Sequence, residues 1–239
     1  MELSEIAGLR PDMLDREQVE PAIHKTVGIL IFPGFELLDV YGPMDLWSNI
    51  NLVPSKLWGD KSNMVGVKLV TVASEKGDIP SHGGVRTVAD YGYADAPHLD
   101  YLIVPGGWGA VPLVEDQPTL DWLRARADRA EIVMSVCNGA SLLAAAGILD
   151  GREATTNKLL WNEATAPGPR VNWIKKARWV DLGNIITASG IAAGIDMTHA
   201  LISRLYGEDV GKWIELWTEY EPHRDPSWDP YSEMAGLVG

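Results

Sequence analysis

This sequence is dominated by short apolar runs. Each run is followed by a break that contains Gly or Pro and then by a helical pattern, and this alternation is compatible with few folds. Residues 26–32, 101–104 and 131–136 are three such runs. Runs that are largely apolar, without polar alternation, are typical of strands covered on both faces. Because they alternate with helices, they predict an α/β fold: a three-layer sandwich with a mostly parallel central sheet and helices on both faces.

The other segments complete this plan. We predict a further strand at 65–73, a hairpin at 178–187 that turns at 182–184, and a short strand at 154–156. Residues 51–64 are expected to form an exposed insertion. The chain therefore divides into an N-terminal extension (1–25), one α/β domain (26–220) and a Pro-rich, irregular C-terminal tail (221–239). Helices are predicted at 36–47, 116–130, 140–146, 159–164, 191–206 and 208–220.

Composition narrows the function classes. The 239 residues are 46% hydrophobic, enough for one compact core, and the net charge of −13 disfavours nucleic acid or an anionic membrane as a partner. The sequence contains no run that approaches the ~20 apolar residues of a membrane-spanning helix. The acidic N-terminus lacks a signal-peptide pattern, and the single cysteine suits a reducing compartment, so we expect a cytoplasmic protein.

That cysteine, Cys137, lies at the turn between a predicted strand and a small-residue helix. A side chain at such an elbow projects clear of the backbone, towards the free amides and positive dipole end of the following helix. This environment predicts a lowered thiol pKa and a nucleophilic thiolate. Ser135 and Gly139 on either side are small, as a tight elbow requires. The alternative is an inert buried cysteine.

Two other loops should meet Cys137, because the carboxyl ends of parallel strands lie at one edge of a sheet. Asp39 follows the first strand and is a candidate acid–base group, or alternatively a helix cap. Gly107, after the 101–104 strand, and Asn138 are candidate backbone amide donors for an oxyanion hole. Trp108 and Ile191, near these loops, are candidate pocket residues.

A hydrolytic cysteine normally needs a nearby imidazole. His82, on the Gly-rich loop 81–84, is the best-placed of the five histidines and is a further candidate pocket residue. His199, in a predicted helix, is expected to be a packed side chain. The spacing of His, Asp and Glu predicts no metal site, and no phosphate-binding glycine motif follows the first strand.

Five short motifs follow one another along the sequence: Leu38-Asp39-Val40-Tyr41-Gly42-Pro43, Val104-Pro105-Gly106-Gly107, Ser135-Val136-Cys137-Asn138-Gly139, Ala154-Thr155-Thr156 and Gly190-Ile191-Ala192-Ala193-Gly194-Ile195-Asp196. In this order they resemble the ThiJ/PfpI superfamily, whose fold is flavodoxin-like and of the class I glutamine amidotransferase type. The resemblance spans about residues 26–220 and is nearest to the isocyanide hydratase branch, in which Asp occupies the Leu-Asp-x-x-Gly-Pro position matched by Asp39. Two positions depart from that branch: Asn138 stands where it has Thr, and Asn157 where it has His. These departures leave other electrophiles open as substrates.

The resemblance implies a homodimeric lyase of the hydratase type that uses no metal or organic cofactor. Cys137 would attack a small electrophilic substrate, an isocyanide, to form a thioimidate. Asp39 would donate a proton and then activate water, which releases an N-substituted formamide. A glyoxalase or deglycase acting on reactive carbonyls is the second enzyme hypothesis. A non-catalytic redox-sensing or ligand-binding module, with Cys137 oxidised, is the third.

Overall fold

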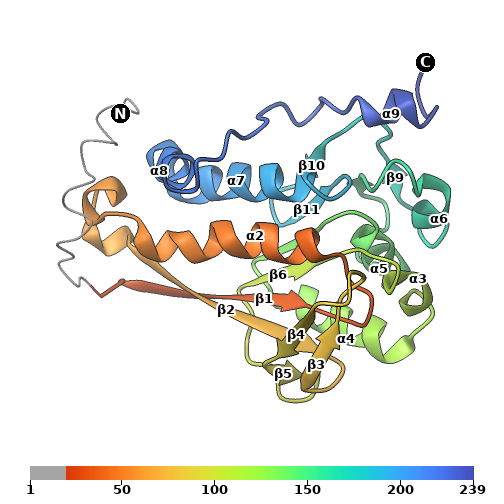
Figure 1. Ribbon diagram of the computed structural model, residues 1–239, viewed down its shortest axis with the longest axis horizontal. Coiled ribbons are helices and arrows are strands. Elements are labelled where there is room, and N and C mark those ends of the chain that lie inside the picture. The colour runs from red at the N-terminus through yellow and green to blue at the C-terminus, as the bar shows by residue number, and fades with distance from the viewer. Residues whose placement is uncertain (1–19) are drawn as a thin grey trace.

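A seven-stranded sheet forms the centre of the protein, whose computed structural model describes residues 20–239 (Figure 1). The strand order is β10-β11-β7-β6-β1-β2-β5, and every neighbouring pair is parallel except β10 and β11. The predicted mostly parallel sheet is therefore confirmed. Its strands are β1 (Ile23–Leu30), β2 (Val65–Ala73), β5 (Tyr91–Gly92), β6 (Tyr101–Val104), β7 (Ile132–Ser135), β10 (Trp179–Asp181) and β11 (Ile185–Ala188).

The direction of the connections places helices on both faces. The chain moves one way along the sheet from β1 to β2, and the opposite way from β6 to β7 and on to β11. Since such crossovers are right-handed, α2 covers one face and α4 and α5 cover the other. Helices α7 and α8 pack against α2, and the three helices form a layer on the same face of the sheet (Figure 1). The helices are α2 (Leu37–Asn49), α3 (Ala110–Leu113), α4 (Gln117–Ala127), α5 (Gly139–Ala145), α6 (Trp161–Thr165), α7 (Ala193–Tyr206), α8 (Glu208–Thr218) and α9 (Tyr231–Met234).

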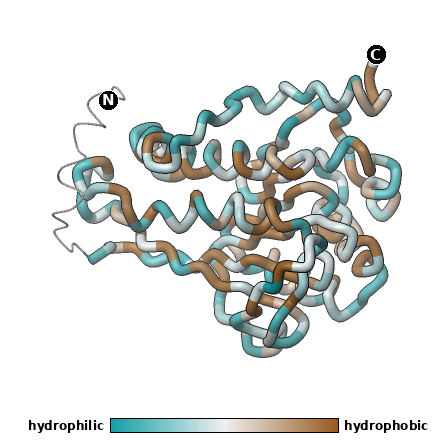
Figure 2. The backbone as a smooth tube through the Cα atoms, viewed as in Figure 1, coloured by the Kyte–Doolittle hydropathy of each residue, from teal (hydrophilic) through white to brown (hydrophobic). Residues whose placement is uncertain are grey.

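Hydrophobic residues lie along the central strands and the inward turns of the covering helices, whereas the outer loops are mostly hydrophilic (Figure 2). All four residues of β6 and all four of β7 are buried, as their apolar sequences predict. Among residues 20–239, no helix is long and apolar enough to cross a membrane.

Several predicted segments differ from the structure. The insertion at 51–64 forms three 3₁₀ turns, and it is not fully exposed: Leu57 and Trp58 are buried, with the Trp58 ring 5.6 Å from that of Tyr206. The chain also contains a hairpin that the sequence analysis missed, β3 (Gly77–Pro80) with β4 (Arg86–Ala89). The short strand β8 (Glu153–Ala154) pairs with β9 (Asn172–Trp173) outside the main sheet.

Both ends of the domain differ from the predicted boundaries. β1 begins at Ile23, three residues before the predicted strand, and residues 1–19 of the proposed extension lie outside the described residues. The C-terminal segment is not simply an irregular tail. It contains α9 and the fully or nearly fully buried side chains of Asp229 and Ser232.

The sheet reverses its direction of winding between β1 and β6, and ligands of open α/β sheets bind at the carboxyl ends of the strands at such a point. The loops that follow β1, β6 and β7 carry Asp39, Gly107 and Cys137 respectively. The topology therefore brings the predicted reactive residues to one edge.

Candidate active site

The loops after β1, β6 and β7 are joined by hydrogen bonds at this edge. The Gly106 amide donates to Oδ2 of Asp39 at 2.9 Å, and the Glu36 amide donates to the Gly106 carbonyl at 2.9 Å. The Asn138 side chain is paired with the backbone of Gly107, through Gly107 N to Oδ1 at 2.7 Å and Nδ2 to the Gly107 carbonyl at 3.0 Å. The predicted meeting of the three loops is confirmed.

Cys137 occupies a strained backbone conformation between β7 and α5. Its φ of 58° is in the left-handed region, which a residue with a Cβ rarely adopts, and its amide donates to the Ser189 carbonyl at 2.9 Å. A Cβ at Gly139 would lie 2.3 Å from the Val104 carbonyl oxygen, so only glycine fits two residues after the cysteine. The backbone therefore forms the predicted elbow.

Three N–H groups donate hydrogen bonds to the Cys137 side chain: the backbone amides of Asn138 and Ile191 and the carboxamide of Asn157. The Asn157 oxygen accepts from the Leu160 amide at 2.9 Å, which leaves its NH₂ group for the sulfur. From the sequence, Asn157 was evident only as a departure from a motif, and its role as a donor to the sulfur was missed. The Thr155-Thr156 motif could have indicated that this loop lies beside Cys137. In the structure, the Thr156 hydroxyl donates to the Cys137 carbonyl at 2.9 Å.

The prediction of a lowered thiol pKa is wrong for the protein without substrate. Burial, with only 5% of Cys137 exposed, raises the pKa of its thiol to about 12, and the negative charge of Asp39 contributes in the same direction. The three N–H donors oppose this shift but do not outweigh it. A buried anion loses the stabilisation of water, and here that loss exceeds the benefit of the hydrogen bonds.

Asp39 is fully buried in α2, and one of its carboxyl oxygens has no partner. Oδ2 accepts from Gly106, whereas Oδ1 is buried without a hydrogen bond. Burial raises the pKa of Asp39 from 3.8 to about 7, the Gly106 amide lowers it, and the charge of Glu36 raises it further. Asp39 does not cap its helix, because the residue at that position is Glu36. A carboxyl group that titrates near neutrality, with a free oxygen, is suited to proton transfer.

The other residues predicted from the sequence have different positions and partners in the structure. The Gly107 amide is not a free donor, because it is bound to Asn138, and this corrects its predicted role. Ile191 contributes its backbone amide, and has a φ of 30°. His82 is exposed on the turn between β3 and β4, where its amide donates to the Phe35 carbonyl at 2.8 Å. His199 is buried, with its Nε2 atom 2.8 Å from Oε1 of Glu215, as expected of a packed side chain.

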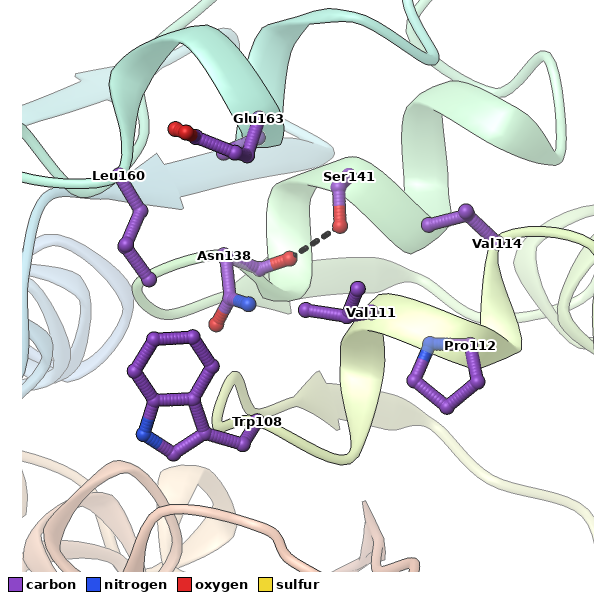
Figure 3. A pocket seen from close by; sticks show the side chains of 9 residues that line it. Trp108, Val111, Pro112, Val114, Asn138, Ser141, Leu160 and Glu163 are labelled. Atoms are coloured by element: carbon purple, nitrogen blue, oxygen red, sulfur yellow. Dashed lines mark hydrogen bonds between the residues drawn. The ribbon is translucent and has the colours of Figure 1, made fainter.

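Trp108 lines a cavity of about 350 Å³ beside the elbow, between α3, α5 and α6 (Figure 3). The indole ring extends towards Asn138, whose side chain borders the cavity. The remaining lining is mainly apolar, and the carboxylate of Glu163 lies at its upper side in this view. The lining residues are Trp108, Val111, Pro112, Val114, Asn138, Ser141, Leu160, Glu163 and Ala164.

Residues 25–204 match the DJ-1/PfpI family, and this match covers most of the chain and all of the site. The chain belongs to the DJ-1/PfpI family. The resemblance inferred from the motifs is thereby confirmed, as is the fold. A crystal structure of a ThiJ/PfpI family protein from Pseudomonas syringae has a TM-score of 0.71 and 26% identity, covering 94% of this chain and 90% of that one. Drosophila melanogaster DJ-1beta shares the fold at a TM-score of 0.65 and 17% identity, with coverage of 83% and 100%.

DJ-1/PfpI relatives of this chain include both an enzyme and a regulator. This chain is 37% identical over 201 residues to the isonitrile hydratase of Pseudomonas putida, and the alignment covers 82% of this chain and 78% of that protein. It is also 28% identical over 192 residues to the HTH-type transcriptional regulator GbdR of Pseudomonas aeruginosa, covering 80% of this chain but only 51% of the regulator. The similarity supports a hydratase-type enzyme within a family that also contains non-enzymes.

Proposed function

We propose that this protein hydrates an organic isocyanide to an N-substituted formamide, with Cys137 as nucleophile and Asp39 as the proton-transfer group. The observation that carries the proposal is the pairing of a buried thiol with a buried carboxyl group in the absence of an imidazole. None of the five histidines, all of which lie within residues 20–239, contributes to the pKa of Cys137. Amide hydrolysis normally uses a histidine to protonate the leaving amine, whereas isocyanide hydration expels no amine.

The reaction needs one proton carrier. The Cys137 sulfur attacks the terminal carbon of R–N≡C, and Asp39 gives its proton to that carbon, forming the thioimidate R–N=CH–S. Asp39, now a carboxylate, takes a proton from water as the oxygen adds to the carbon, and passes that proton to the nitrogen. The C–S bond then breaks as the hydroxyl proton returns to Asp39 and the carbonyl forms, which releases R–NH–CHO and the thiolate and restores the protonated Asp39. The Asn138, Ile191 and Asn157 donors stabilise the sulfur anion at the start and the end of the cycle.

Access to the sulfur favours the same class of substrate. Cys137 is only 5% exposed, so a slender one-atom terminus such as an isocyanide carbon suits it better than a branched carbonyl. The substituent on nitrogen would lie in the cavity bordered by Trp108 and Asn138. The similarity to the Pseudomonas putida isonitrile hydratase is independent support. The homodimer implied by the resemblance stays a prediction.

The test is product formation from an aryl isocyanide in deuterated water. We expect the aryl formamide, with deuterium on the formyl carbon because Asp39 exchanges its proton with solvent, and no product above background from Cys137→Ala. Methylglyoxal serves as the competing substrate. Turnover of methylglyoxal but not of the isocyanide, or equal rates from the two proteins, would replace this proposal by the glyoxalase or the non-catalytic hypothesis.

The pH dependence of kcat/KM should report the paired proton. The reactive form of the Cys137–Asp39 pair holds a single proton, which is on Asp39, while Cys137 is a thiolate. At low pH both the thiol and the carboxyl group are protonated, so this reactive form is depleted. Because the pKa of Asp39 is raised to about 7, kcat/KM is expected to increase roughly tenfold per pH unit below pH 7 and to level off above it. Initial rates between pH 5 and 9 measure this profile. A profile that is flat from pH 5 to 8 would remove Asp39 from the reaction.

A further inference from the structure

A buried ion pair lies next to the candidate site and belongs to none of the steps above. The side chains of Lys158 and Asp229 are 2% and 0% exposed, with Nζ and Oδ2 3.3 Å apart. Removing two charges from water is costly, so a buried pair persists only where further hydrogen bonds surround it. Burial lowers the pKa of Lys158 to about 8, while the charge of Asp229 acts in the opposite direction.

The Lys158 ammonium is bound to the two residues that precede Asn157. Nζ donates to the Thr155 hydroxyl at 2.6 Å and to the Thr156 carbonyl at 3.0 Å, and it reaches the Ala177 carbonyl at 2.9 Å. Asn157, between Thr156 and Lys158, donates its carboxamide to the Cys137 sulfur. The ammonium therefore fixes the chain on both sides of a donor to the nucleophile.

Asp229 comes from the C-terminal segment, which sequence analysis treats as a tail. This segment crosses the region of β9 and β10 before α9 (Figure 1). The Arg178 amide donates to the Pro226 carbonyl at 2.7 Å, and the Ser232 hydroxyl donates to the Lys175 carbonyl. The Asp229 carboxylate itself accepts from the Tyr231 amide at 3.1 Å. Its position is thus set by the fold of residues 225–235.

We infer that Lys158 and Asp229 are positioning residues, which hold the Asn157 carboxamide against the Cys137 sulfur and make the C-terminal segment part of the active site. For turnover the inference rests on the proposed function. For the reactivity of the thiol it does not, because Asn157 contacts the sulfur whatever the substrate is. Without the pair, Thr155 and Thr156 lose their common donor, and Asn157 loses its fixed orientation.

Alkylation of Cys137 by iodoacetamide tests this inference. Since Cys137 is the single cysteine of the sequence, one mass shift reports one site. The key variant combines Lys158→Met with Asp229→Leu, because replacing both members of a buried pair by apolar residues is often tolerated. Asn157→Ala removes the donor directly. Glu233→Gln is the matched control, as it removes an exposed ion pair of the same C-terminal segment, in which Lys176 Nζ and Glu233 Oε1 are 2.9 Å apart.

The double variant and Asn157→Ala are expected to slow alkylation at pH 8 about tenfold, because the thiolate loses one of the N–H donors that stabilise it. Glu233→Gln should stay within twofold of wild type. A folded double variant that is alkylated at the wild-type rate would overturn the inference, as would an equal slowing in Glu233→Gln. A variant that melts at a lower temperature but alkylates normally shows a structural role alone. Because no isocyanide is used, failure of the proposed function leaves this result readable.

Discussion

Replacement of Asp39 by Asn is expected to lower kcat/KM for isocyanide hydration by about 10²-fold or more and, at the same time, to stabilise the fold above pH 7. The loss of activity follows from the removal of the proton-transfer group. The gain in stability follows from its burial: Asp39 is fully buried, and Oδ1 has no hydrogen-bond partner. Asn is uncharged and its oxygen can still accept from the Gly106 amide.

The pH range of the stabilisation is set by the pKa of Asp39. Its value is raised from 3.8 to about 7 in the folded protein, so the carboxyl group favours folding below pH 3.8 and this contribution is lost as the pH rises through 7. A shift of three units is worth on the order of 4 kcal/mol above pH 7, which is the upper limit of the gain from Asn. At pH 4 the two proteins should be nearly equal in stability.

Urea unfolding at pH 4 and pH 8, together with initial rates, measures both effects. Asp45→Asn is the matched control, because Asp45 lies in the same helix but is exposed, and both its activity and its stability should stay near wild type. An Asp39→Asn protein that is folded and retains activity would reject the catalytic role. An Asp39→Asn protein destabilised at pH 8 would contradict the raised pKa.

The second large effect is expected at Gly139, where a single methyl group should displace the elbow. A Cβ there would lie 2.3 Å from the Val104 carbonyl oxygen and 2.7 Å from that of Pro105. These are backbone atoms at the end of β6, so they cannot rotate away as a side chain would. Gly139→Ala is therefore expected to lower the free energy of unfolding by about 3 kcal/mol, near the upper end for overpacking, and to lower turnover sharply, because Cys137 is two residues away.

Gly83→Ala provides the comparison. A Cβ at Gly83 would meet only the flexible end of Leu37, at 3.3 Å, in an exposed turn. Its stability should stay within about 0.5 kcal/mol of wild type, as for most surface substitutions. Urea unfolding and the rate of Cys137 alkylation measure both variants. Equal stability of Gly139→Ala and Gly83→Ala would show that the elbow tolerates a side chain.

The sequence by itself determined the central strands, the strand-to-helix elbow and the meeting of Asp39 with Cys137. The strands follow from short apolar runs, which only a sheet covered on both faces can bury throughout. The elbow follows from the small residues around Cys137. The shared edge follows from the geometry of parallel strands, whose carboxyl ends lie together whatever the details of their side chains.

Only the tertiary structure decided how the groups at that edge are partnered. The Gly107 amide is occupied by Asn138, the Asn157 carboxamide reaches the sulfur, and Lys158 is neutralised by Asp229 from 71 residues further along the chain. Burial also reversed the expected shift of the Cys137 pKa. Local patterns fix which backbone a segment adopts, but hydrogen-bond partners and desolvation depend on residues that are distant in sequence and become neighbours only when the chain has folded.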